Sequence, residues 1–364
     1  MSDIASLVEG RRILVCCGSG GVGKTTTAAV LALEGARRGR RAVVVTIDPA
    51  KRLADALGME SLSNTAHQIE GDWSGELWAL MLDTKSTFDA LVAKYSANPE
   101  QAHGILDNRF YRNIAGALSG TQEYMAMEKL YELNDEERFD LIVVDTPPTR
   151  NALDFLDAPR RLTRMLDNRI FRWLMMPTRA YLRAVSVATQ AFLRTISRVV
   201  GSEVIQDVVN FFQAFEGMEE GFRGRAQEVL QLLGDERTAF ILVTSPRRDA
   251  VEEGVFFAEK LTEAGLDVEA LIVNRIHPRF GNGMAETDRQ RASTLGDTDL
   301  ARLYANRADF RQIGDGEERH METLTKRVAP APVVRVPFLD SDVHDVEGLG
   351  EVARYLLGSE TAVS

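Results

Sequence analysis

Residues 16–27 read CCGSGGVGKTTT and fit two phosphate-binding patterns at once. Their glycines match the dinucleotide fingerprint G-x-G-x-x-G, and together with Lys24 and Thr25 they match the P-loop pattern G-x-x-x-x-G-K-T. Both patterns need glycine because backbone N–H groups must approach phosphate oxygens with no Cβ in the way. A P-loop lysine also donates to the β- and γ-phosphates, and the hydroxyl after it ligates Mg²⁺, whereas a dinucleotide site needs neither group. The glycine-rich stretch alone does not distinguish the dinucleotide pattern from the P-loop pattern, so a second motif is needed.

An apolar run that ends in an acid provides this second motif. Residues 141–149 read LIVVDTPPT, and Asp145 closes the apolar run. A P-loop site requires an acid at the end of a strand near its metal, and the dinucleotide pattern predicts no such acid. Asp48 also ends an apolar run, but a ribose-binding acid would stand at the same place, so Asp48 does not discriminate. The sequence therefore predicts a nucleoside triphosphate with Mg²⁺ rather than a redox cofactor.

Seven short apolar runs, several rich in β-branched residues, predict buried strands. They cover residues 11–18, 42–48, 76–83, 139–145, 238–245, 268–274 and 332–338. Helical patterns separate most of these runs, which favours a mostly parallel sheet flanked by helices on both faces. We therefore expect an α/β protein with a P-loop NTPase fold, in which residues 1–364 form a single P-loop ATPase domain.

Residues 155–233 depart from this alternation because they contain no run typical of a strand. Apolar residues within 182–199 and within 204–222 recur at steps of three and four, which predicts one continuous helix face in each stretch. We expect residues 155–233 to form an α-helical insertion between strands of the core. Residues 281–330 are polar and are expected to be helical with loops.

The composition is that of an ordinary soluble globular protein, with 45% hydrophobic and 27% charged residues. Acidic residues outnumber basic ones by 54 to 43, which disfavours nucleic acid as a general partner. Cys16 and Cys17 are the only cysteines, and because adjacent strand residues point to opposite faces we expect no disulfide between them. The N-terminus lacks the apolar run of a signal peptide, and no stretch reaches the length of a membrane span. We expect a cytoplasmic protein.

Three motifs in the correct order resemble those of the ArsA-type P-loop ATPases. GSGGVGKT is similar to their P-loop, TIDPAKRLADALG (46–58) to their switch I and DTPPTRNAL (145–153) to their switch II. The family includes the arsenite-pump ATPase and the ATPase that targets tail-anchored proteins. Weaker similarity continues at LIVNRI (271–276) and VPFL (336–339). The resemblance implies an ATPase that binds ATP and Mg²⁺ and works as a dimer.

Carried over to this sequence, the resemblance implies a role for each matching residue. Lys24 and the backbone of residues 20–26 would hold the phosphates, Thr25 would bind Mg²⁺ and Asp145 would reach it through a water. Asp48 would orient and polarise the attacking water, although an N-cap before Pro49 is the structural alternative. The expected catalytic residues are Asp48 and Lys24, and the expected nucleotide-binding residues are Gly20, Gly21, Val22, Gly23, Lys24, Thr25, Thr26, Asn274, Pro337 and Phe338, the last three beside the adenine.

Three departures from the family pattern change what we expect. Ser19 stands where the family usually carries a lysine that crosses the dimer to the partner's nucleotide, so Lys51, Arg52, Arg150 or a partner subunit would have to supply that cation, or hydrolysis is slow. Residues 281–330 have no cysteine, so the zinc-binding Cys-x-x-Cys of the targeting ATPase is absent and we expect no zinc. Arsenite pumping is disfavoured too, because it uses thiolate ligands and none follows Cys17.

The helical insertion is the candidate client-binding subdomain. Residues 169–185 read RIFRWLMMPTRAYLRAV, in which aromatic and methionine side chains suit a groove for varied apolar helices. Nine arginines lie between residues 160 and 198 with Asp167 as the one acid among them, which would also suit an anionic membrane surface. Ordinary helix packing with a solvated arginine face is the third alternative.

The sequence leaves the particular function open among three alternatives. The first is a Mg²⁺-dependent ATPase whose homodimer or heterodimer, opened and closed by nucleotide, handles a hydrophobic helix client or a membrane protein, in the cytoplasm or peripherally at the membrane. The second is a regulatory subunit that hydrolyses ATP weakly or not at all and pairs with a lysine-bearing paralogue. The third is a MinD-like positioning ATPase, which its short, weakly basic C-terminus disfavours.

Overall fold

The computed structural model describes residues 3–48, 50–114, 121–147, 158–161, 163–164, 167 and 202–358. Its contacts divide the chain into two compact units. The first contains Met1–Met81, Leu133–Leu153 and Gly234–Ser364, and the second contains Leu82–Glu132 and Asp154–Leu233.

The first unit is built on an eight-stranded sheet with the order β3-β4-β2-β5-β1-β6-β7-β8. Its strands are β1 (Ile13–Cys17), β2 (Arg41–Thr46), β3 (His67–Ile69), β4 (Glu76–Met81), β5 (Leu141–Asp145), β6 (Thr238–Thr244), β7 (Val268–Ile276) and β8 (Val333–Pro337). Every neighbouring pair is parallel except β3 and β4. All seven predicted strands are confirmed, and so is the mostly parallel α/β fold. The short antiparallel edge strand β3 was not predicted.

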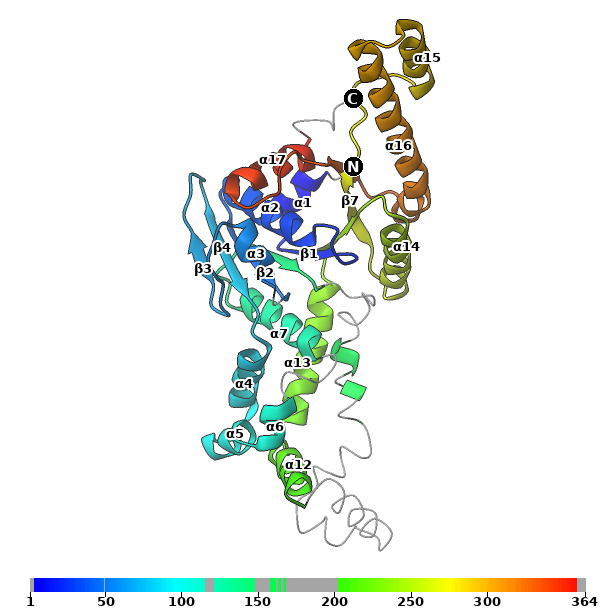
Figure 1. Ribbon diagram of the computed structural model, residues 1–364. Coiled ribbons are helices and arrows are strands. Elements are labelled where there is room, and N and C mark those ends of the chain that lie inside the picture. Colours follow the sequence, from blue (N-terminus) through cyan, green and yellow to red (C-terminus); the bar gives the residue numbers. More distant parts are fainter. Residues whose placement is uncertain are drawn as a thin grey trace, which may run out of the picture. The chain divides into compact units, whose positions relative to one another are not determined.

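Helices cover the sheet of the first unit (Figure 1). They are α1 (Ile4–Gly10), α2 (Lys24–Arg37), α3 (Arg52–Ala56), α14 (Arg248–Glu263), α15 (Ala285–Leu295), α16 (Asp299–Val328) and α17 (Val346–Leu356). α2 packs on β1, β2 and β5, and α17 packs on α2 and β8, whereas α14 packs on β6 and α16 on β7. Every side chain of β1, β5 and β6 is buried, as expected of central strands in a parallel sheet with both faces covered. α15 and α16 confirm the helical prediction for residues 281–330.

The described part of the second unit is helical. It contains α4 (Thr84–Tyr95), α5 (Pro99–Leu106), α6 (Arg109–Ile114), most of α7 (Thr121–Asp135), α12 (Ser202–Ala214) and α13 (Glu219–Leu233). α12 packs against α5 and α6, so residues 82–132, which the sequence did not assign to the insertion, share a unit with it. Residues 168–200 lie outside the described residues, as does the stretch 169–185 on which client binding was based.

The single helix predicted over residues 204–222 is wrong. α12 ends at Ala214, and a turn with Gly217 at φ 85° precedes α13. The apolar residues that gave this period nevertheless pack together. The ring centroids of Phe211 and Phe215 lie 4.9 Å apart, and those of Phe215 and Phe222 lie 5.9 Å apart. Side chains from both helices and the turn meet in that cluster, and a helical period alone does not show where the backbone turns.

Candidate functional site

The glycine-rich loop joins β1 to α2, and its backbone geometry explains its glycines. Gly18 has φ 146°, and a Cβ there would stand 2.0 Å from the backbone oxygen of Val243. Gly23, the residue before α2, has φ 96°, and a Cβ there would stand 2.2 Å from Nδ2 of Asn274. Residues that carry a Cβ rarely adopt such φ values, so glycine is required at both positions. The loop therefore leads directly into the N-terminus of α2, where free backbone N–H groups favour an anion.

Lys24 is the first residue of α2 and is only 6% exposed. Its Nζ donates to the backbone oxygen of Ser19 at 2.8 Å, inside the loop. Burial lowers the pKa of Lys24, and the charge of Asp145 counteracts that effect. The ammonium group thus lies within the loop with little water around it, a position in which an anionic ligand would interact with it strongly.

Asp145 lies at the end of β5, between the ends of its neighbours β1 and β2. The register pairs it with Cys16 on one side and Thr46 on the other. Its Oδ2 accepts from Oγ1 of Thr25 at 2.8 Å and from Oγ1 of Thr46 at 2.9 Å. Burial raises the pKa of this carboxyl to about 6, although both hydroxyls and Lys24 lower it.

These groups fit a magnesium site. Oδ1 of Asp145 is buried and has no hydrogen-bond partner among the described residues. A carboxylate oxygen and the hydroxyl of Thr25 are hard oxygen donors of the kind that Mg²⁺ prefers. Mg²⁺ usually keeps waters and takes substrate phosphates as further ligands, so a cage made only of protein side chains is not needed. Within the described ranges, no group of three or more His, Cys, Asp or Glu side chains is arranged to hold a metal ion.

Asp48 follows β2 and keeps its carboxylate near the surface, 14% exposed. Its Oδ1 accepts from the backbone N–H of Ala50 at 3.0 Å, and its Oδ2 lies 3.5 Å from Nη1 of Arg52. The structural alternative, an N-cap role, is wrong, because α3 starts at Arg52 with Lys51 in the cap position. Asp48 instead closes a short turn of the loop. Its backbone N–H lies 3.2 Å from Oγ1 of Thr46, which also contacts Asp145.

The residues expected beside the adenine lie at the ends of β7 and β8. Nδ2 of Asn274 donates to the backbone oxygen of Val22 at 2.9 Å, so in this structure the amide holds the glycine-rich loop. Pro337 is buried at the end of β8. Phe338 is 51% exposed, and its ring centroid lies 5.1 Å from that of His277. The structure thus brings Asn274 and Phe338 to the same edge of the sheet as the loop, while their contact with a base stays a prediction.

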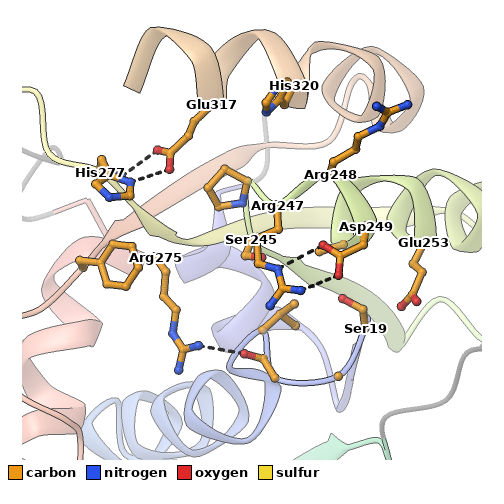
Figure 2. Close-up of a pocket in the computed structure, with 16 residues that line it drawn as sticks. Ser19, Ser245, Arg247, Arg248, Asp249, Glu253, Arg275, His277, Glu317 and His320 are labelled. Carbon is orange, nitrogen blue, oxygen red and sulfur yellow. Dashed lines mark hydrogen bonds and ion pairs between the residues drawn. The ribbon is translucent and has the colours of Figure 1, made fainter. Parts of the chain in front are cut away.

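A cavity of about 760 Å³ opens beside residues 19–22 of the loop (Figure 2). Its other walls come from the segment after β6, the ends of β7 and β8, and α16. The charged and histidine side chains that line it are Arg247, Arg248, Asp249, Glu253, Arg275, His277, Glu317 and His320. Sequence reasoning missed all of them. The run SPRRD (245–249) directly after a strand was a usable signal, because the carboxyl ends of parallel strands share one edge of a sheet.

The side chains proposed to replace the missing lysine are not gathered around Ser19. Ser19 lines the cavity and is 8% exposed, and its Oγ has no hydrogen-bond partner in the described part of the chain. Arg52 is 60% exposed and faces Asp48. Lys51 lines a different, smaller hollow, and Arg150 lies outside the described residues. The two cysteines are buried, which raises the pKa of both thiols and disfavours thiolate chemistry.

A strand, a glycine-rich loop and a helix that carry a lysine and a hydroxyl, with a buried acid on the neighbouring strand, define a P-loop nucleoside triphosphatase. The sequence model of the anion-transporting ATPases, the ArsA ATPase family, matches residues 11–293. The chain belongs to this family. It is an ATPase that binds nucleotide, as its motifs predicted.

Individual relatives are similar over three quarters of the chain or more, at low identity. The protein named ATPase GET3 of Malassezia globosa is 26% identical over 348 residues, which are 94% of this chain and 90% of the relative. ATPase GET3 of Podospora anserina is 25% identical over 278 residues, 75% of this chain and 76% of the relative. The putative arsenical pump-driving ATPase 1 of Aquifex aeolicus is 21% identical over 353 residues, 96% of this chain and 79% of the relative.

Proposed function

We propose that this ATPase binds ATP with Mg²⁺ on its glycine-rich loop and hydrolyses it to ADP and phosphate. The observation that carries the proposal is the convergence of Lys24, Thr25 and Asp145 at the N-terminus of α2. Phosphoryl transfer requires positioning and charge neutralisation more than covalent help, and these three groups are suited to both. Lys24 and the backbone of residues 20–26 would hold the phosphates, and Thr25 with Asp145 would hold the metal ion.

The bound Mg²⁺ would supply positive charge to the phosphate oxygens. On loading, we expect Nζ of Lys24 to exchange its bond with the Ser19 carbonyl for phosphate oxygens, which keeps the buried ammonium paired throughout. Asn274 and the Pro337–Phe338 pair would border the base. The exposed ring of Phe338 offers a face for stacking, and the Asn274 amide offers polar groups for the base edge.

For Asp48 we propose the role of orienting and polarising the attacking water. Its carboxylate has a position in support of this role, since it is partly exposed on a short loop after β2, next to Thr46 and thus to Asp145. A carboxylate there can accept a hydrogen bond from water while its own backbone stays fixed by Thr46. The same loop can also respond to the γ-phosphate and change its conformation when the phosphate leaves.

Two substitutions separate binding from chemistry. We expect Lys24→Ala to abolish ATP binding, and Asp48→Asn to bind ATP and lose turnover. Calorimetric titration with ATP and a phosphate-release assay measure the two effects. Asp55→Asn serves as the matched control, because Asp55 is an exposed acid of the neighbouring helix α3. Unchanged turnover in Asp48→Asn would refute the role in water activation, and unchanged binding in Lys24→Ala would refute the site.

We further propose that nucleotide opens and closes a dimer, either of this chain or with a paralogous ATPase, and that the helical unit handles a hydrophobic or membrane-associated client. The support is the family resemblance and the apolar, arginine-rich composition of residues 155–233. Light scattering of Asp48→Asn with and without ATP measures the dimer, and purification from the native cell with ATP and Mg²⁺ identifies a client that co-elutes. In the described part of the chain, no helix is long and apolar enough to span a bilayer.

Ser19 favours one alternative, a regulatory subunit with weak hydrolysis that depends on a lysine-bearing paralogue. Robust turnover by the purified chain alone, lost in Lys24→Ala, would rule this alternative out. The MinD-like alternative has less support, because the apolar side chains of α17, the last described helix, are buried in the core and are not free for a membrane.

A further inference from the structure

Arg275 has a backbone conformation that an arginine rarely adopts. Its φ is 60°, in the left-handed region, and it lies where the pairing of β7 with β8 shifts register between Asn274 and Ile276. Arg275 is thus the extra residue of a bulge. A non-glycine residue at positive φ costs free energy that the surrounding structure must supply, and such residues cluster at functional sites.

The bulge turns two consecutive side chains toward the glycine-rich loop. In a regular strand, neighbouring side chains point to opposite faces of the sheet. Here Nδ2 of Asn274 donates to the backbone oxygen of Val22 at 2.9 Å, and Nη1 of Arg275 donates to that of Gly21 at 3.1 Å. Figure 2 shows the Arg275 side chain reaching from the strand to the loop. A bulge redirects a side chain in just this way.

Arg275 also differs from the other two arginines that line the cavity. Arg247 pairs with Asp249 at 2.6 Å, and Arg248 pairs with Glu252 at 2.9 Å, both on α14 or next to it. Among the described residues, Arg275 has no carboxylate partner within ion-pair distance. Its contact is the loop carbonyl, and its guanidinium keeps further N–H donors on the cavity side.

We propose that Arg275 is a positioning residue of the nucleotide site, which holds Gly21 and Val22 together with Asn274 in the conformation that binds phosphate. A glycine-rich loop loses much conformational freedom when it orders around a ligand, so contacts that order it beforehand increase affinity. The hydrogen bonds from Asn274 and Arg275 fix two carbonyl groups of the loop. The backbone N–H groups of the loop stay available for phosphate oxygens. This inference rests on the proposed binding of ATP at the loop.

Two variants of Arg275 separate the side chain from its backbone strain. We expect R275A and R275G both to weaken ATP affinity about tenfold, the effect of one hydrogen bond from a charged donor. Without nucleotide, R275G should melt about 1–3 °C higher than R275A, because glycine adopts the left-handed conformation freely. Turnover at saturating ATP should stay within about twofold of the wild type, since an ordered loop acts on binding and not on the chemical step. R248A, which removes another arginine of the same cavity, should bind ATP as the wild type does.

Calorimetric titration of the full chain with ATP and Mg²⁺ gives the affinities, and thermal unfolding gives the melting temperatures. Wild-type affinity in both R275A and R275G, with binding lost in Lys24→Ala, would overturn the role of Arg275 alone. An equal loss of ATP affinity in R248A would overturn it too, because the loss would then reflect the positive charge of the cavity and not the contact of Arg275 with the loop. Binding that survives Lys24→Ala would instead overturn the proposed nucleotide site itself.

Discussion

Asp145 is a buried acid whose protonation decides what the site can bind. Its pKa is raised to about 6 by burial, so in the folded protein without ligand it takes up a proton at a pH where the unfolded chain would not. A metal ion needs the deprotonated carboxylate. The Mg²⁺-dependent part of the ATP affinity should therefore be full above the folded pKa and fall as the pH drops through it.

We predict that Asp145→Asn removes this Mg²⁺-dependent part at every pH and weakens binding about tenfold or more, because the metal loses its anionic anchor. The same change should also remove the loss of stability that the wild type without nucleotide shows as the pH rises from about 4 to about 6, because only the wild type has to ionise a buried carboxyl there. Titrations with ATP at several pH values, with and without Mg²⁺, measure the first effect, and denaturant unfolding measures the second. An ATP affinity of the wild type that rises as the pH falls would contradict the assignment.

At the residue scale, sequence reasoning finds what is local. Lys24, Thr25 and Asp145 were predicted because a short pattern and a strand end place them, and Thr25 and Asp145 are in contact. Arg275 and the His277–Glu317 pair, 2.6 Å apart, could not be predicted in the same way. A bulge and a contact across 40 residues of sequence depend on the assembled sheet and on α16, for which no short pattern exists.

Among the elements, α15 and α16 are held together by a buried ionic cluster. Asp288 on α15 is 1% exposed, and its carboxylate accepts from Arg307 at 2.7 Å and from Arg311 at 2.6 Å, both on α16. Arg311, 6% exposed, also donates to the backbone oxygens of Arg279, Phe280 and Gly281, and so ties the loop before α15 to α16. Removing one partner of such a cluster leaves a charge buried without compensation.

We predict that Asp288→Ala destabilises the α15–α16 pair by about 1–3 kcal/mol, because Arg311 would lose its carboxylate partner and keep only its three backbone acceptors. Hydrogen exchange of the amides in residues 280–328 measures this local stability. Asp299→Ala is the control, since that acid is 96% exposed in its pair with Arg302 and should change the stability little. Equal protection in the two variants would show that the cluster does not hold the helices together.

At the scale of elements, the strands were predictable and the helix boundaries were less so. The central strands β1, β5 and β6 are fully buried apolar runs, as expected where helices cover both faces of the sheet. β4 and β8 are only partly buried but still consist mainly of apolar residues, so their sequences also predict strands. β3 has no such apolar run, because it consists of three residues at the sheet edge and two of them are exposed. The turn after Ala214 was missed for a different reason. The aromatic residues of α12, the turn and α13 pack in one cluster, and their spacing in the sequence stays helical across the turn.

For the whole molecule, the chain passes four times between the two units, after Met81, Glu132, Leu153 and Leu233. Two of these passages join a helix of the second unit to a strand whose carboxyl end borders the candidate nucleotide site. α7 continues to β5, which ends at Asp145, and α13 continues to β6, which is followed by the cavity residues 245–250. The helical unit is therefore covalently linked to two strands whose ends border the site, and the proposed handling of a client would act through these links.

Ser19 bears on the proposed dimer, because the family resemblance implies a lysine at this position that acts across the dimer. A cation supplied in trans to a triphosphate stabilises charge that develops in the transition state, and its absence slows the reaction. Ser19 lies at the wall of the cavity of about 760 Å³ and is 8% exposed. We predict that Ser19→Lys raises kcat about tenfold or more and leaves the ATP affinity within about threefold, because the charge acts on the transition state.

Ser19→Gln is the matched control, since glutamine extends the side chain without adding a charge, and it should leave kcat unchanged. Phosphate release measured over a range of protein concentrations decides the case. If the lysine acts in trans, the gain should grow with concentration as dimers form, and it should vanish in the Ser19→Lys, Lys24→Ala double variant. A Ser19→Lys chain that is no faster than Ser19→Gln at any concentration would mean that a missing cation does not limit turnover. That result would remove the support that Ser19 gives to the regulatory-subunit alternative.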